Sequence, residues 1–219
     1  MATVWFEAEC PVAARERQWI DDRMSWFVDQ FGAAWLESPV VSLTDEFFPG
    51  AYDGTEQDIR RVVVNVCGYM DVAPEHIRVG FAAGGAGARP VITLGGSIYR
   101  NPLLLVATIA RALAYERLVG EKRMTADQVD EEPADDLLTV FLGLGVITAN
   151  AAPAFSHATA DEAGLRATRL GRLTPPMYGY ALARYAIMRG ERRPRWVRSV
   201  DASPRAYLKT SLRYLRRSS

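Results

Sequence analysis

The most constraining feature of this sequence is a run without charged residues, from Asn101 to Ala110, inside a pattern typical of a helix. Asparagine followed by proline is a typical helix start, because asparagine accepts hydrogen bonds from free backbone N–H groups and proline fits the first turn. The first charge after this start is Arg111. A helix without a polar face must be buried nearly all round. The sequence therefore predicts a buried helix over 102–119 that stops at Gly120.

Other helices are expected to pack around this one. Residues 11–31 form one amphipathic pattern, and Thr55 can cap a second helix. The second has the cleanest helical spacing in the chain, with the apolar set Ile59, Val62, Val63, Val66, Cys67 and Met70. Pro133 starts another apolar helix, in which Gly143 and Gly145 should permit close packing. Two further helices are predicted to open at Pro175-Pro176 and Ser203-Pro204.

Two short segments in the middle of the chain look like strands, 77–83 and 90–95. The loop GGAGAR between them predicts a β-hairpin. This loop lacks the Lys-Ser/Thr ending and the following helix of a phosphate-binding loop, so nucleotide binding there is disfavoured. The expected fold class is α+β: one mostly helical domain over 1–219, with a small β-hairpin or sheet.

The balance of charges disfavours some classes of partner. The chain has 26 basic and 26 acidic side chains, which argues against nucleic acid or an anionic membrane as the main partner. The C-terminal segment 190–219 is basic, because it contains nine basic side chains and only two acidic ones, Glu191 and Asp201. A solvated or acid-pairing helix is the preferred interpretation of this segment, and contact with nucleic acid is the less favoured one.

The location expected from the sequence is a bacterial-type cytoplasm. Cys10 and Cys67 are too few for a secreted disulfide framework. The first residues lack the basic and apolar regions of a signal peptide. No apolar run reaches the ~20 residues of a membrane span, so no membrane association is expected.

Several segments resemble a family of uncharacterised bacterial zincin-like proteins, which are similar to zinc metallopeptidases. Residues 106–120, VATIARALAYERLVG, resemble an active-site helix of the form V-A-T-x-A-H-E-L-A-H-x-x-L-L-G. Residues 130–145, DEEPADDLLTVFLGLG, resemble the acidic stretch and helix that follow it. The segments EFFPGAYDGT and PPMYGYALA are similar as well, so the resemblance runs from about residue 18 to the end.

The resemblance implies a zinc site that this chain has lost. In such proteins two histidines four residues apart bind Zn²⁺, the glutamate between them is the general base, and a downstream E-x-x-x-D pair supplies a ligand and its support. Here Arg111, Ala112 and Tyr115 replace the motif residues, whereas Glu132 and Asp136 preserve the downstream pair. Arginine cannot ligate a cation, and alanine cannot accept a proton. These five residues are expected to form a remodelled site with no metal, no cofactor and no catalytic residue.

Histidines elsewhere in the chain do not supply an alternative set of ligands. The two that it contains, His76 and His157, lie far in sequence from the altered motif. A tyrosinate can ligate zinc, but Tyr115 together with one carboxylate is a poor ligand set. Tight metal binding is therefore not expected at this site.

The preferred functional hypothesis is a zincin-like pseudoenzyme that binds an unknown protein partner or a small ligand, through the old cleft or the basic C-terminal helix. It predicts that Arg111 pairs with the retained carboxylates and lowers their pKa. One alternative is a hydrolase that uses Glu132 or Asp136 as its base, which requires an open pocket and a carboxylate with a raised pKa. Another is a structural subunit with a large apolar patch. Without the resemblance, Arg111 could simply extend to solvent, and the acidic segment 127–136 could be a solvated loop that favours the next helix N-terminus.

Overall fold

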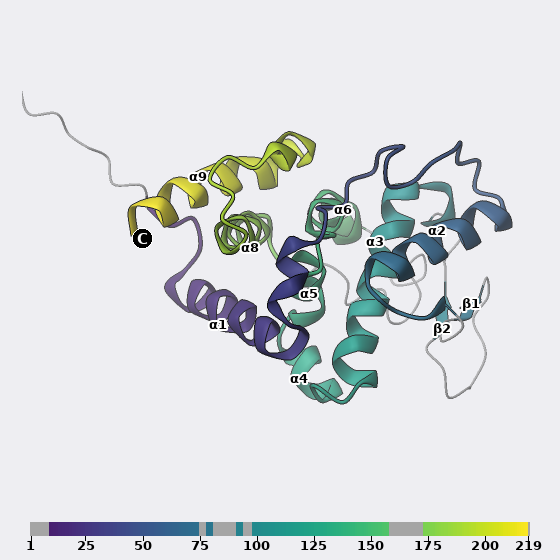
Figure 1. Cartoon of the computed structure of the whole chain (residues 1–219), viewed down its shortest axis with the longest axis horizontal. Helices are drawn as coiled ribbons and strands as arrows, with labels where there is room; N and C mark the ends of the chain where they lie inside the picture. Colours follow the sequence, from purple (N-terminus) through teal and green to yellow (C-terminus); the bar gives the residue numbers. More distant parts are fainter. Residues whose placement is uncertain (1–8, 75–77, 81–90, 94–97, 158–172, 219) are drawn as a thin grey trace, which may run out of the picture.

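A computed structural model describes residues 9–74, 78–80, 91–93, 98–157 and 173–218 of the chain. Helices dominate this part of the molecule (Figure 1). They are α1 (Ala14–Phe31), α2 (Glu56–Tyr69), α3 (Pro102–Tyr115), α4 (Ala126–Glu131), α5 (Ala134–Phe141), α6 (Gly145–His157), α8 (Pro175–Met188) and α9 (Ala202–Ser218). Short 3-10 turns occur at Ala33–Glu37, Ile98–Arg100 and Arg195–Ser199, and a π-helical turn at Glu116–Gly120.

The expected α+β class with a β-hairpin is wrong. Within the two predicted strand segments, the structure has only the three-residue strands β1 (Arg78–Gly80) and β2 (Val91–Thr93). These two strands pair in parallel, whereas the strands of a hairpin are antiparallel. The intervening loop, 81–90, lies outside the described residues. Two strands of three residues cannot form a layer that buries a core face. Helices supply the core throughout the described part of the chain, which is therefore all-α in class.

Helix α3 is buried as its sequence predicts. Side chains on every side of it between Leu105 and Ala114 are inaccessible to solvent, with Ala112 as the half-buried exception. The Asn101 side chain begins the helix, since its Oδ1 accepts hydrogen bonds from the N–H groups of Leu103 and Leu104 at 3.0 and 3.3 Å. Buried side chains of α1, α2, α5, α6, α8 and α9 join those of α3 in one continuous core.

The apolar helix expected after Pro133 is in fact two helices, α5 and α6. Gly143 separates them with a φ of +88°, a conformation that disfavours other residues. A methyl group at this position would lie 2.7 Å from the carbonyl oxygen of Pro39. A methyl group on Gly145 would lie 2.9 Å from Cα of Val140. The prediction that both glycines permit close packing is thus confirmed, although the chain also turns there.

Helix α9 lies against α8 at one end of the molecule, and α2 lies at the other end (Figure 1). The contact between α8 and α9 depends on Gly179, where a methyl group would lie 2.4 Å from Cβ of Tyr207 and 2.7 Å from the backbone nitrogen of Leu208. Among the described residues, no helix has both the length and the apolar character needed to cross a bilayer.

Candidate functional site

Arg111 is a fully buried arginine in the middle of the fold. Its side chain is 1% exposed, and its Nε lies 2.7 Å from Oδ1 of Asp136. Its Nη2 lies 3.9 Å from Oδ2 of Asp135. The packing of α3 against α5 brings these charges together, because a guanidinium in an apolar interior requires an anionic partner. The expectation that Arg111 is buried and pairs with a retained carboxylate is confirmed for Asp136, but Glu132 pairs with Arg23 instead. The alternative of a solvent-pointing Arg111 is wrong.

Asp136 has further polar contacts that hold it in place. Its side chain is fully buried, and its Oδ2 accepts a hydrogen bond from the backbone N–H of Leu173 at 3.3 Å. Its carbonyl oxygen accepts one from Oγ1 of Thr139 at 2.7 Å. The same hydroxyl lies 2.9 Å from Oγ1 of Thr148 on α6. Polar side chains of α3, α5 and α6 are therefore connected inside the core.

Tyr178 of α8 completes this group, which we call the buried polar cluster: Arg111, Asp136, Thr139, Thr148 and Tyr178. Burial raises the pKa of the Tyr178 phenol well above its usual value, and the negative charge of Asp136 raises it further, against the opposing charge of Arg111. The phenol is therefore protonated over the physiological pH range. It can donate a hydrogen bond, but it cannot act as a tyrosinate base or metal ligand.

Glu132 lies outside the buried polar cluster. Its carboxylate is 40% exposed and forms an ion pair at 2.5 Å with Nη2 of Arg23, which belongs to α1. Burial raises the pKa of Glu132, but hydrogen bonds from Trp19 and Arg23 and the charge of Arg23 outweigh it, so that its pKa lies below the usual range. The two carboxylates of the predicted E-x-x-x-D pair thus have different cationic partners, Arg23 for one and Arg111 for the other.

The other two altered motif positions, Ala112 and Tyr115, are half-buried and pack against the core. Within the described part of the chain, no group of three or more His, Cys, Asp or Glu residues is arranged to hold a metal ion. His76 lies outside the described residues, and so does the side chain of His157. Because Asp135 and Asp136 lie close to the Arg111 guanidinium, the site favours an ion pair over a metal.

Neither carboxylate of the E-x-x-x-D pair is poised to act as a general base. A base at neutral pH needs access to its substrate and a raised pKa. Asp136 has no exposed surface and is held by Arg111. Glu132 is accessible, but its pKa is lowered. Asp136 is therefore inaccessible to a substrate, and Glu132 has a lowered pKa.

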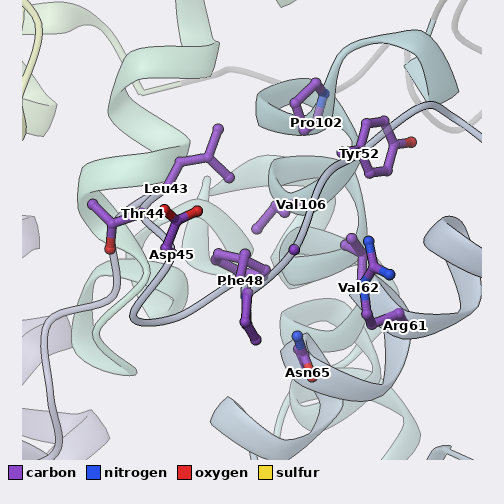
Figure 2. A pocket seen from close by; sticks show the side chains of 12 residues that line it. Leu43, Thr44, Asp45, Phe48, Tyr52, Arg61, Val62, Asn65, Pro102 and Val106 are labelled. Atoms are coloured by element: carbon purple, nitrogen blue, oxygen red, sulfur yellow. The ribbon is translucent and has the colours of Figure 1, made fainter.

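A cavity of about 160 Å³ lies away from the buried polar cluster, between the segment 43–52, α2 and the start of α3 (Figure 2). Its lining is mainly apolar, with Phe48 at the centre and Val62 and Val106 behind it. Arg61 is at its edge, where Nη2 already donates to the carbonyl oxygen of Ala51 at 2.7 Å. An apolar cavity of this size accommodates a group about as large as benzene. It shares no residue with the buried polar cluster.

Sequence reasoning found Arg111 and Asp136 but missed their partners Thr139, Thr148 and Tyr178. The signal available was that buried tyrosine and threonine hydroxyls require hydrogen-bond partners. Which helices would supply those partners depends on the packing of α5, α6 and α8, and no sequence spacing encodes that packing.

Comparisons with known proteins do not assign this chain to a family. No protein-family model matches it, and no curated protein or solved structure shows significant similarity to it. Its function must therefore be argued from its own residues.

Proposed function

We propose that this protein is a catalytically inactive, zincin-like pseudoenzyme that acts by binding a protein partner. The observation that carries the proposal is the buried ion pair between Arg111 and Asp136. Arg111 stands where the resembled family has its first zinc-binding histidine. Its guanidinium supplies, next to the retained aspartate, the positive charge that a metal would otherwise supply.

Electrostatics support the loss of metal chemistry at this position. A divalent cation and a guanidinium in one dry site would repel each other strongly, because interactions are poorly screened there. Ala112 offers no carboxylate to activate water, and the pKa of Glu132 is lowered by Arg23 and Trp19. The alternative hydrolase, with Glu132 or Asp136 as base, has less support, since each carboxylate already has a cationic partner. The proposed setting is the cytoplasm, where Cys10 and Cys67 would persist as free thiols.

The first test is elemental analysis of the protein purified without chelators, together with a peptidase assay in the presence of zinc. We expect no stoichiometric zinc and no zinc-dependent cleavage, because both motif histidines are replaced. Close to one tightly bound zinc ion per chain would overturn the proposal.

A gain-of-site variant tests the zincin-like scaffold itself. The substitutions Arg111→His, Ala112→Glu and Tyr115→His restore the motif, with the two histidines ~6 Å apart along the helix axis. We expect micromolar or tighter zinc binding by calorimetry, and a higher melting temperature on addition of zinc. Adding Asp136→Ala is the matched control and should weaken binding, because Asp136 is the carboxylate that lies next to position 111. If the triple variant folds and binds zinc no better than the parent, the scaffold has no zincin geometry.

A further inference from the structure

The net charge of zero conceals a strong separation of charge along the chain. Residues 190–219 contain nine basic and two acidic side chains, a net charge of +7. The preceding 189 residues contain 17 basic and 24 acidic side chains, a net charge of −7. At physiological ionic strength charges are screened beyond ~8 Å, so a partner at one end of the molecule responds to the local charge and not to the total.

Most of the positive charges of the C-terminal segment are at exposed positions. The buried side chains of α9, such as Leu208, Leu212 and Leu215, belong to the face that joins the core beside α8. The opposite side of the helix is exposed and basic. Together with exposed arginines before α9 it forms what we call the basic face: Arg192, Arg193, Arg195, Arg198, Lys209, Arg213, Arg216 and Arg217.

Among the described residues, the eight side chains of the basic face have no acidic partner at ion-pair distance. Helix α2 shows the contrasting arrangement, because Arg60 pairs with Glu56 at 2.5 Å and Arg61 pairs with Asp58 at 2.8 Å. Like charges four residues apart on a helix destabilise it, and Lys209 and Arg213 are such a pair.

The helix dipole explains only part of the basic face. Cations in the last turn of a helix are stabilising, which accounts for Arg216 and Arg217. It does not account for Lys209, nor for the four arginines at 192–198, which precede α9. A negatively charged partner would relieve the repulsion among these like charges, so the basic face is suited to binding one.

We propose that the basic face binds an acidic helical segment of a protein partner, a proposal that rests on the partner-binding function above. Lys209, Arg213 and Arg217 follow one another at four-residue spacing and form a row with ~6 Å between successive positions. An acidic helix with carboxylates at the same spacing repeats with the same rise, so the two rows match in register. Guanidinium groups bind carboxylates through two parallel hydrogen bonds, which adds direction to the attraction.

Two other polyanions fit less well. Membrane binding by a basic helix needs an apolar face to enter the lipid, and the apolar face of α9 is already buried in the core. For nucleic acid, residues 190–219 contain no Asn or Gln, the side chains that read adenine, and could read only guanine through Arg and Lys. The remainder of the molecule, with its charge of −7, would also repel a polyanion that extends beyond the basic face.

A labelled peptide of Glu-Ala-Ala-Ala repeats is the probe, and fluorescence anisotropy is the measurement. We expect binding that weakens as salt is raised, and weaker binding of a peptide with the same charge whose helix is interrupted by prolines. The variant Lys209→Glu/Arg213→Glu/Arg216→Glu should bind at least about tenfold more weakly. Its matched control, Arg15→Glu/Arg60→Glu/Lys122→Glu, changes the net charge equally at other exposed positions and should bind within about twofold of the parent. Equal binding by the two variants overturns the proposal.

Further probes test the choice of partner. A duplex oligonucleotide and vesicles containing phosphatidylserine are titrated at physiological ionic strength. Tighter binding of either one than of the helical peptide overturns the assignment to an acidic protein segment. The peptide experiment and the zinc experiment have independent outcomes. If the peptide does not bind, the inactive zincin-like assignment is unchanged. If the parent protein contains zinc, that assignment is overturned, but the proposal for the basic face is unchanged.

Discussion

The arginines of the buried polar cluster and of the basic face differ in burial and in ion pairing. Arg111 has no contact with water, and it lies within bonding distance of a carboxylate that is itself fully buried. The arginines of the basic face are exposed, and none of them forms an ion pair with a described residue. Helix α8 connects the two regions, since it contributes Tyr178 to the cluster and packs against α9.

This difference follows from the cost of removing a charge from water. A buried guanidinium without a partner would cost several kcal/mol, so its pairing is a condition of folding. An exposed guanidinium is stabilised by water and needs no partner for the chain to fold. Pairing at the buried site therefore contributes to the stability of the fold, whereas folding makes no such demand on the exposed basic face.

The largest expected effect comes from breaking the buried pair. Arg111→Ala should lower the free energy of unfolding by ~3–5 kcal/mol, because it leaves Asp136 charged and buried. Denaturant unfolding measures the loss. Arg60→Ala, at an exposed ion pair, is the control and should change stability by less than ~0.5 kcal/mol. A change at Arg111 as small as that of the control would show that the pair contributes nothing to the fold.

A second substitution disrupts the packing of α9 against α8 without changing any charge of the basic face. Gly179→Ala places a methyl group 2.4 Å from Cβ of Tyr207 and should force α9 away from α8. We expect a loss of ~1–3 kcal/mol and faster amide hydrogen exchange in α9. Gly68→Ala is the matched control, since nothing lies within 4 Å of the added group and alanine favours a helix. Unchanged exchange in α9 would contradict the close approach at Gly179.

The smallest expected effect on stability is at Glu132. This residue forms an ion pair, as Arg111 does, but its side chain is 40% exposed. Its pKa is lowered in the folded protein, so its contribution to stability is present above its unfolded pKa, near 4.5, and is lost as pH falls through the folded value. The parent should therefore exceed Glu132→Gln in stability at neutral pH by less than ~1 kcal/mol. The gap should close below pH ~4. A gap that persists in acid would show that the ion pair with Arg23 is not its source.

Local signals in the sequence predicted the helices well. The predicted cap residues Asn101 and Thr55 both accept hydrogen bonds from the first turns of the helices that follow them, and α8 begins at Pro175 as expected. The β-hairpin was wrong because alternation over a few residues does not provide strands with a layer to pack against. The continuous helix after Pro133 was wrong because the turn at Gly143 follows from its close approach to Pro39, a residue more than 100 positions away in sequence.

The sequence by itself determined where several of the helices begin, that α3 is buried, and that a buried Arg111 needs an acidic partner. It could do so because caps, apolar periodicity and the cost of an unpaired buried charge act over a few residues or on one side chain. Only the tertiary structure decided that the partner is Asp136 and not Glu132, that Tyr178 and Thr148 join them, and that α8 leaves one side of α9 exposed and basic. These outcomes depend on which helix faces meet, and the packing of the whole chain selects that arrangement.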